Sequence, residues 1–364
     1  MQLQNLTAHI ESLLKTTIFP SLAQTDALPS QPLVPLNPNR VYKVTRYLLI
    51  CLYENLTGPL IPSVLQYVRD KLSSKRRTIS AKKNVKYGPK ERNRLDIYYP
   101  DRGSTKDNSR AGFPVIILIS TSWNSGNRAT CIPVAENLIS QRYVVVVPDI
   151  TLYPEGKISE MVADVQQCMF WTSARIRQYR GDPSQIYLMG HAAGAVLSAL
   201  TVIHHACATL RLLPPNNTRL HLPVWNETAK KGLEHVHAMP RVMGNTAESL
   251  RQCSPAHLIH NVLMSTQKYE KFRKLLPEKT VLIHGANDTF NPSITARNFY
   301  YLLNSMGVSV QFKIYKDIKH ISPRIDLIAP SKKLCTLLLD DIRECCQMSD
   351  DPIVKKKSWD EREE

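Results

Sequence analysis

The sequence lacks the cysteine patterns of a metal site or of a disulfide scaffold. It has 364 residues and eight cysteines, and none of them forms a C-x-x-C pair or a Cys/His pattern with metal-ligand spacing. Several lie inside apolar periodic segments, where a free thiol behaves as a small hydrophobic side chain. The 13 glycines and 24 prolines exclude a collagen-like or low-complexity chain. We therefore expect reduced core thiols in a cytosol-facing protein, and neither a metal nor another cofactor.

We expect neither a cleaved export signal nor an uninterrupted membrane-spanning run in this sequence. Its first five residues have no basic segment followed by a short apolar one. Residues 47–68 are the most apolar stretch, but Glu54, Pro59 and Pro62 interrupt it, and two prolines at this spacing break a helix. Two interpretations stay open: a pair of short helices packed on the main domain or covering its pocket, and an anchor in the membrane interface. We assign residues 1–80 to an N-terminal helical region that contains this segment.

Acidic residues are the minority, with 31 Asp and Glu against 47 Lys and Arg, for a formal net charge of +16. More than half of the excess lies between Arg69 and Arg94, where eleven basic residues face two acidic ones. This basic run lacks interleaved aromatic residues and any nucleic-acid-binding module, so we expect no nucleic-acid partner. An anionic membrane surface, bound through residues 47–94, fits the charge better. We expect a membrane-associated, cytosol-facing protein, with the endoplasmic reticulum as one candidate membrane, and otherwise a cytoplasmic one.

The remainder of the chain alternates strand and helix patterns. Helical patterns are found at 158–179, from Ala193 onward and at 292–306. The runs that predict strands are residues 94–100, 113–120, 143–150, 185–190, 280–285 and 309–315. This alternation predicts an α/β domain over residues 81–348, a mostly parallel twisted sheet with helices on both faces. Residues 211–245 break the pattern and are expected to form a lid, and residues 349–364 a disordered charged tail.

One strand pattern leads into a motif that carries chemistry. The strand ending at Gly190 continues as His191-Ala192-Ala193-Gly194 and then as a helix, which is the context of the G-x-S-x-G nucleophile elbow. Glycines at 190 and 194 suit this motif because the turn leaves no room for side chains on either side of its centre. Ala192 stands where the serine hydroxyl is expected, so the nucleophile is missing.

The other members of a catalytic triad follow in the order acid, then histidine. Asp288 comes directly after the strand at 280–285, and His320 comes after the strand that ends at Tyr315. An aspartate at such a strand end would orient the imidazole, which would act as a base toward residue 192. We therefore predict that Ala192, Asp288 and His320 meet at the carboxyl edge of the sheet, where open α/β sheets bind their ligands.

Residues 85–345 resemble the α/β-hydrolase carboxylesterases, most closely the isoprenylcysteine methylesterases. The resemblance rests on the GDPSQIYLMGH lead-in to the elbow, Ser254-Pro255, the HGANDTFNP acid loop and the late histidine. It implies a small-molecule ester or a prenyl or lipid-like ligand, because these enzymes hydrolyse the carboxyl methyl ester of prenylated cysteine. It also implies that backbone N–H groups of a Gly-Gly-x-Trp loop face the oxyanion.

This oxyanion loop departs from the family pattern. Here it reads Ser120-Thr121-Ser122-Trp123, so the glycines that allow close backbone approach are lost. The expected oxyanion positions are therefore Thr121, Ser122 and the N–H of Ala193 at the helix start. A second altered catalytic element favours natural loss of the serine over an engineered substitution.

Three hypotheses follow for the function. The first is a pseudo-hydrolase that binds a lipid-like or ester ligand without turning it over. The second is an active carboxylic-ester hydrolase, in which Ala192 is engineered or another group substitutes, such as Ser198, the loop serines or a water activated by His320. The third is a membrane-surface scaffold with a vestigial pocket. The first is our main prediction, because removal of a triad serine costs on the order of a million-fold in turnover.

Overall fold

The computed structural model describes the α/β body of the chain. The described residues are 80–100, 112–212, 238–244, 246–265, 268–288, 291–316, 318–320 and 333–346. The expected apolar segment at 47–68, most of the expected lid and the charged tail lie outside these residues. Among the described residues, no helix combines the length and the apolar character needed to cross a membrane.

The main sheet has five strands within the described ranges, in the order β1-β2-β4-β3-β5. β3 pairs in parallel with β4 and β5, whereas β2 runs antiparallel to both β1 and β4. The strands are β1 (Ser80–Lys86), β2 (Arg94–Tyr99), β3 (Phe113–Thr121), β4 (Val144–Pro148) and β5 (Gly181–Ala192). The β-branched runs of β3 and β4 are buried on both faces, as expected for central strands.

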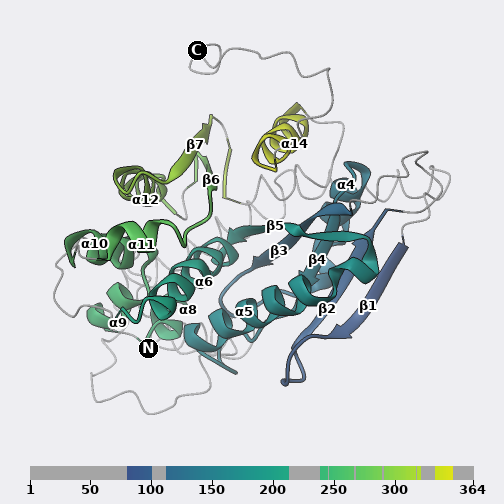
Figure 1. The fold of residues 1–364 in the computed structure, drawn as a ribbon, viewed down its shortest axis with the longest axis horizontal. Helices are drawn as coiled ribbons and strands as arrows, with labels where there is room; N and C mark the ends of the chain where they lie inside the picture. Colours follow the sequence, from purple (N-terminus) through teal and green to yellow (C-terminus); the bar gives the residue numbers. More distant parts are fainter. Residues whose placement is uncertain are drawn as a thin grey trace, which may run out of the picture.

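Two further strands form a parallel pair of their own. β6 (Lys279–Gly285) and β7 (Ser309–Tyr315) are hydrogen-bonded to each other along their whole length. The sequence pattern predicts both strands correctly but does not show that they make a separate two-stranded sheet. Figure 1 shows this pair beyond the β5 end of the main sheet.

Helices cover both faces of the main sheet. The side chains of alternate positions in β3 enter two core clusters, with Ile117 in one and Ile116 in the other. The first cluster includes residues of α5 (Ile158–Arg175) and α6 (Ala193–Thr209), which cross the front of the sheet in Figure 1. The second includes residues of α4 (Ile132–Ser140) and α14 (Lys333–Cys345). This two-sided arrangement confirms the expected fold class.

The remaining helices lie beside α6 and the β6–β7 pair. α10 contacts both α6 and α12, and α12 packs on β7. These helices are α8 (Ala238–Val242), α9 (Ala247–Gln252), α10 (Pro255–Ser265), α11 (Tyr269–Arg273) and α12 (Ile294–Ser305). Elsewhere, the 3-10 turn η4 (Arg128–Cys131) contacts α4, and η5 (Ile176–Tyr179) contacts α5 and β5. α12 begins two residues after Pro292 and is followed by Gly307 with φ +68°. α8 is the last part of the expected lid, whereas residues 213–237 lie outside the described residues.

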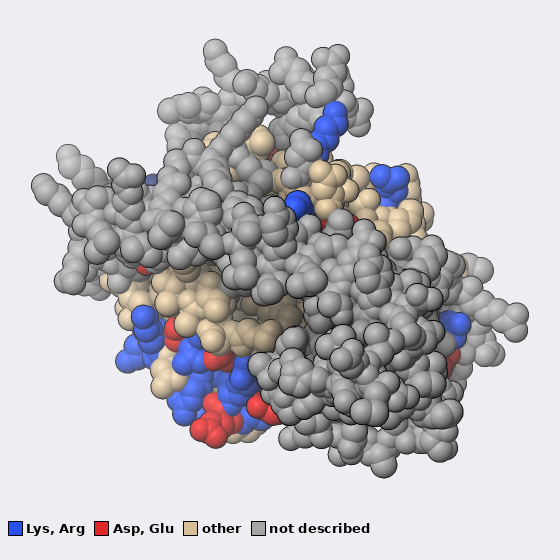
Figure 2. All heavy atoms as spheres, turned by 180° about the vertical axis from the view of Figure 1, so that it is seen from behind, with Lys and Arg blue, Asp and Glu red and all other residues tan. Residues whose placement is uncertain are grey.

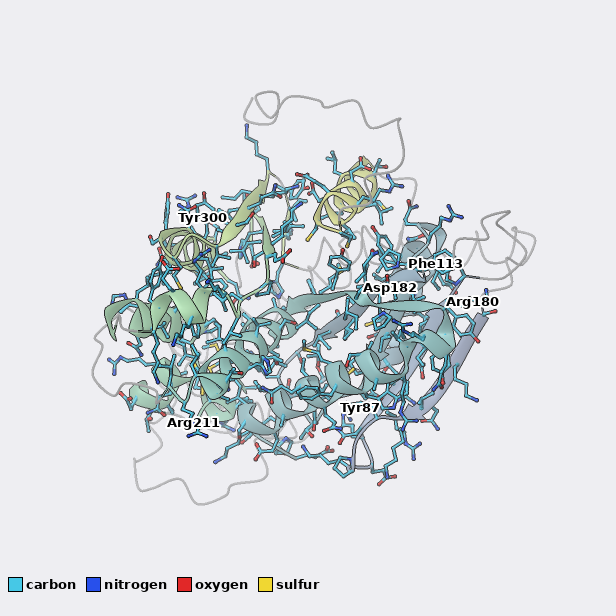
Figure 3. All side chains as sticks on the ribbon, in the orientation of Figure 1. Tyr87, Phe113, Arg180, Asp182, Arg211 and Tyr300 are labelled. Atoms are coloured by element: carbon cyan, nitrogen blue, oxygen red, sulfur yellow. The ribbon has the colours of Figure 1, made fainter. Side chains whose placement is uncertain are left out.

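β5 is longer than the strand predicted from residue 185. It begins at Gly181, where the N–H of Phe113 donates to the carbonyl of Arg180 at 2.7 Å, and Figure 3 shows Phe113, Arg180 and Asp182 grouped at this end. The register shifts between Phe113 and Val115 before regular pairing resumes at Ile186. The GDP lead-in therefore forms the irregular start of the strand that ends at the elbow.

Part of the basic run belongs to the sheet. β1 supplies exposed lysines at 82, 83 and 86, but the Nζ of Lys90 binds Asp164 at 2.9 Å and Thr151 at 2.9 Å. In Figure 2 the described part of the rear face shows Lys and Arg side chains next to Asp and Glu, rather than a patch of one sign. Some of the positive charge near the end of this run thus stabilises the fold.

Candidate active site

The turn between β5 and α6 has the backbone of a nucleophile elbow. Ala192, its central residue, has φ 55° and ψ −123°, a conformation that costs a non-glycine residue about 1–3 kcal/mol. A Cβ atom on Gly194 would lie 1.9 Å from the carbonyl oxygen of Ile119, and one on Gly190 would lie 2.4 Å from that of Gly194. Glycine is therefore required at both positions, because the start of α6 packs directly on β3. The elbow keeps its geometry although residue 192 carries only a methyl group.

Asp288 and His320 meet at the carboxyl ends of β6 and β7. The Nδ1–H of His320 donates to Asp288 Oδ2 at 2.8 Å, and the N–H of Asn291 donates to the other carboxylate oxygen, also at 2.8 Å. The Asp288 side chain is only 5% exposed, whereas that of His320 is 24% exposed. A buried, doubly hydrogen-bonded carboxylate fixes the orientation and the tautomer of the imidazole, leaving Nε2 as its basic nitrogen.

Backbone contacts hold the two loops together. The N–H of Asn287 donates to the carbonyl of Ile318 at 3.0 Å, and the N–H of Ala286 donates to that of Tyr315 at 2.9 Å. His191 connects this pair to the elbow. Its Nε2–H donates to the carbonyl of His320 at 3.2 Å, and the two imidazole rings lie 5.7 Å apart. Because His191 directly precedes Ala192, this contact brings the carboxyl ends of β5, β6 and β7 to one site.

The loop after β3 lies beside the elbow. Thr121 pairs with Ala192 in the parallel register of β3 and β5. The N–H of Ser122 donates to the carbonyl of Ser125 at 3.0 Å, and the carbonyl of Trp123 accepts from the N–H of Tyr153 at 3.0 Å. Ala193 is the first residue of α6, and the N–H groups of a first helical turn have no partner within the helix. The three expected oxyanion positions therefore border the elbow, but the Ser122 amide is already hydrogen-bonded within its own loop.

The other serines near the elbow are not placed as substitute nucleophiles. Ser198 is buried, and its hydroxyl donates to the carbonyl of Gly194 at 2.7 Å. The hydroxyl of Ser120 is buried and has no hydrogen-bond partner within the described part of the chain. The Ser122 hydroxyl contacts Asn124 and Ser125.

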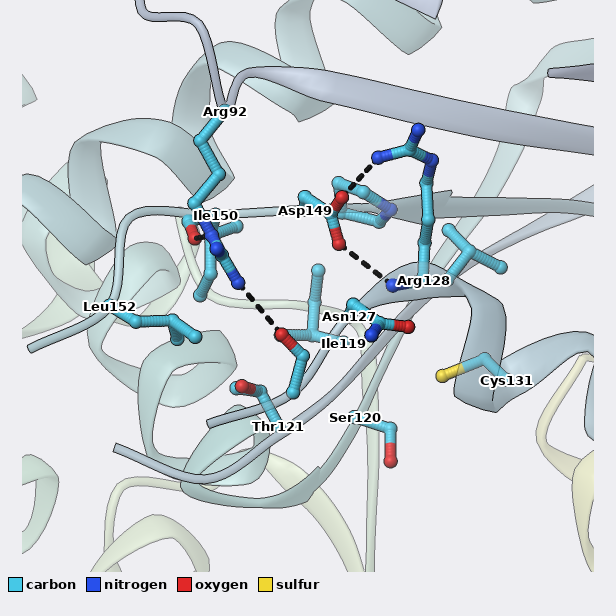
Figure 4. Close-up of a pocket in the computed structure, with 13 residues that line it drawn as sticks. Arg92, Ile119, Ser120, Thr121, Asn127, Arg128, Cys131, Asp149, Ile150 and Leu152 are labelled. Carbon is cyan, nitrogen blue, oxygen red and sulfur yellow. Dashed lines mark hydrogen bonds and ion pairs between the residues drawn. The ribbon is translucent and has the colours of Figure 1, made fainter. Parts of the chain in front are cut away.

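The sequence analysis missed an ion network at Arg128, the first residue of η4. It lies a few residues after the loop that follows β3. Arg128 binds Asp96 at 2.9 Å. It also binds Asp149, whose carboxylate accepts from the backbone N–H of Arg128 at 2.7 Å (Figure 4). Tyr98 donates to Asp96 at 3.2 Å, and burial followed by the Asp96 charge raises the pKa of this phenol. Arg128 is 32 positions from Asp96 and 21 from Asp149 in sequence, so no local pattern signals the ion pairs.

A small cavity separates this network from the loop. It has a volume of about 10 Å³ and is lined by Ser120, Thr121, Arg128 and Asp149, among others (Figure 4). This volume holds at most one water molecule. The cavity is therefore too small for an ester ligand.

Comparison with known proteins agrees with this geometry. Residues 95–218 match the BD-FAE family. The chain is 26% identical over 327 residues to the isoprenylcysteine alpha-carbonyl methylesterase ICME of Arabidopsis thaliana, covering 86% of this chain and 72% of that one. It is 27% identical to the probable methylesterase ICMEL1 of the same plant and 29% identical to the esterase LipQ of Mycobacterium tuberculosis. The last two matches cover 66% and 70% of this chain but only 50% and 59% of those relatives.

Solved esterase structures share the fold. Esterase B from Lactobacillus rhamnosis in an inhibited form gives a TM-score of 0.59 at 16% identity, covering 84% of this chain and 95% of that one. A truncated carbohydrate esterase from gut microbiota gives 0.52 at 16% identity, covering 74% and 96%. The strand order, the elbow and these comparisons together lead to one conclusion: the chain has the α/β-hydrolase fold and is similar in sequence to carboxylesterases.

Proposed function

We propose that this protein binds a carboxylic-ester or lipid-like small molecule in an esterase site and does not hydrolyse it by the serine mechanism. The observation that carries the proposal is Ala192, which has the elbow conformation without a nucleophilic oxygen. The paired Asp288 and His320 support the same site.

The size of the expected rate loss favours ligand binding over ester turnover. Loss of the serine from a triad lowers turnover on the order of a million-fold, and the residual rate depends on substrate binding and the oxyanion hole. Here the Ser122 amide is engaged with Ser125, which weakens that residual contribution. The site keeps its architecture while lacking its reacting atom, a combination suited to retaining a ligand.

The names of the relatives suggest the ligand class. Two of them are named as isoprenylcysteine alpha-carbonyl methylesterases, one as a probable member. We extend this to a ligand that combines a carboxylic ester with a prenyl-like or other lipid chain. Burial of an apolar chain contributes about 25 cal/mol for each Å² removed from water, so such a ligand needs no covalent step to bind.

The direct test is hydrolysis of p-nitrophenyl butyrate by the native protein, A192S and A192S/H320A. We expect no turnover by the native protein, measurable turnover by A192S and loss of that turnover in the double variant. S184A is a matched control, because Ser184 bonds Asp182 at the far end of β5. Native turnover that the added serine does not increase contradicts the proposal.

A second candidate is hydrolysis by a water molecule that His320 activates directly. The intact bond between Asp288 and His320 favours it, since an imidazole oriented in this way is a competent general base. Slow native turnover that disappears in H320A, and that S184A retains, would support this candidate over the binding proposal.

We also propose that residues 47–94 bring the protein to a cytosol-facing anionic membrane. The support is the charge of the basic run, of which Lys82, Lys83 and Lys86 are exposed on β1. Co-sedimentation with phosphatidylserine vesicles should exceed that with phosphatidylcholine vesicles and should fall with added salt. If neutralising these lysines abolishes the cellular function of the protein while bulky substitutions at residue 192 do not, the protein acts as a membrane-surface scaffold instead.

A further inference from the structure

The loop beside the elbow contains an internal acceptor for its own donors. The carbonyl oxygen of Ser125 lies 3.0 Å from the amide nitrogen of Ser122, 3.0 Å from the Ser122 hydroxyl and 3.0 Å from the Thr121 hydroxyl. Each hydroxyl has one proton and alternative acceptors nearby, whereas the Ser125 carbonyl is the acceptor of the Ser122 amide among the described residues. One backbone carbonyl is thus surrounded by three donor groups, as the oxygen of a bound ester would be.

These donors come from positions that border the reacting centre. Thr121 is paired with Ala192 across β3 and β5, so the turn starts beside the elbow. Both hydroxyls around the Ser125 carbonyl belong to Thr121 and Ser122, the residues assigned to the oxyanion loop. The departure from the glycine pattern therefore supplies the Thr121 hydroxyl, and Ser122, at the variable position of that pattern, supplies the other.

The protein fixes the turn at its far end. Arg92 donates through Nη2 to the carbonyl of Gly126 at 2.7 Å and through Nε to that of Ile150 at 2.7 Å (Figure 4). The N–H of Tyr153 holds the carbonyl of Trp123 at the middle of the turn. Opening the turn for a ligand would break the Ser125 contacts while these anchors remain.

We infer that Ser125 determines the specificity of this site: its backbone carbonyl occupies the donors of the 121–125 loop, so that the site rejects the oxyanion of ester hydrolysis. The inference rests on the proposed function and deepens it. A donor engaged by Ser125 is not available to a substrate oxygen, so a ligand is held by apolar contact and by the N–H of Ala193. Esterase chemistry is then blocked at two independent points, residue 192 and the loop.

The test compares A192S with A192S/T121G/S122A, which removes both hydroxyls that hold the Ser125 carbonyl. Loss of one oxyanion donor costs about 10²–10³ in kcat in serine hydrolases. We expect the loop substitutions to raise kcat toward p-nitrophenyl butyrate by on the order of a hundredfold, with a smaller change in KM. A192S/T130A is the matched control, because the Thr130 hydroxyl bonds the carbonyl of Asn127 outside this turn. It should behave as A192S.

Amide hydrogen exchange resolved to single residues gives a second readout that needs no turnover. The Ser122 amide should be protected in the native protein and in A192S, and residue 122 should lose this protection in the loop variant. Equal kcat for A192S and the loop variant, or an unprotected Ser122 amide in A192S, overturns the inference. Ester turnover by the native protein instead contradicts the proposed function, and the exchange measurement still decides whether Ser125 occupies the amide.

Discussion

A Cβ atom on Gly285 would lie 2.2 Å from the carbonyl oxygen of Ile318. This close approach lets the loop that carries Asp288 lie against the loop that carries His320, and the Asn287 N–H bonds the same Ile318 carbonyl at 3.0 Å. The distance between Asp288 and His320 therefore depends on Gly285, which is not part of the pair.

We expect G285A to separate the two loops and to destabilise the protein by about 1–3 kcal/mol, the usual cost of overpacking. Urea denaturation of native and variant measures this. G307A is the control: Gly307 has φ +68° but no atom closer than 3.8 Å to its added Cβ. It should cost about 1 kcal/mol from backbone conformation alone. Equal losses for both variants would contradict the steric explanation.

Asp288 is expected to act on the rate through His320. In the A192S/T121G/S122A background, D288N replaces a carboxylate that accepts from both His320 and Asn291, so the imidazole loses its fixed tautomer. We expect kcat to fall about 10⁴-fold, the size of such a change in serine proteases. D182N removes an exposed carboxylate at the start of β5 and should leave kcat unchanged. A loss below tenfold for D288N would exclude a triad-like role.

A buried ion pair is expected to hold α14 on the β6–β7 pair. Lys313 on β7 binds Asp341 of α14 at 2.6 Å and Glu344 at 2.9 Å, and both Lys313 and Asp341 are buried. K313M leaves the Asp341 charge without its main partner and should cost about 3–5 kcal/mol in urea unfolding. K313M/D341L removes both charges and should recover part of this loss.

The control for this pair is E270A, which breaks the exposed bond between Glu270 and Arg273 at 3.3 Å. It should change stability by less than about 1 kcal/mol. If K313M is as mild as E270A, the pair does not anchor α14.

His204 is expected to make stability depend on pH. Burial lowers its pKa below the ordinary 6.5, so the unfolded chain binds a proton at this residue that the folded protein does not. Stability should therefore fall as the pH drops below about 6.5 and continue to fall until the folded pKa is passed. Urea unfolding at pH 7.5 and 5.5 should show a smaller loss for H204Q than for the native protein. H205Q, at the exposed neighbouring position, should match the native protein, and an H204Q loss as large as the native one would contradict this assignment.

Local sequence patterns predicted most of the fold. The β-branched runs of β3 and β4 and the alternation in β2 are visible without any tertiary information, because central strands are apolar on both faces. β1 was missed since it is an edge strand rich in lysine, with an irregular register between Lys82 and Val85. The helical patterns named in the sequence analysis do not include α4, α8 to α11 or α14. Three of these, α8, α9 and α11, are only five or six residues long, and the stability of short helices comes from packing rather than from a clear period.

The elbow can be predicted from a short stretch of sequence. Two glycines around Ala192, between a strand and a helix, fix a turn with one central residue, and that residue has no hydroxyl. Gly190 is required by a contact within the turn, with the carbonyl of Gly194, whereas Gly194 is required by a contact with Ile119 of β3.

The rest of the site depends on contacts between segments that are distant in sequence. The bond between Asp288 and His320 joins residues 32 positions apart and depends on the pairing of β6 with β7. The engagement of the Ser122 amide by Ser125 depends on a turn that Arg92 anchors from another part of the chain. In both cases several hydrogen-bond partners are available. The sequence shows which donors and acceptors exist, but the packing of the whole domain determines which of them form hydrogen bonds with each other.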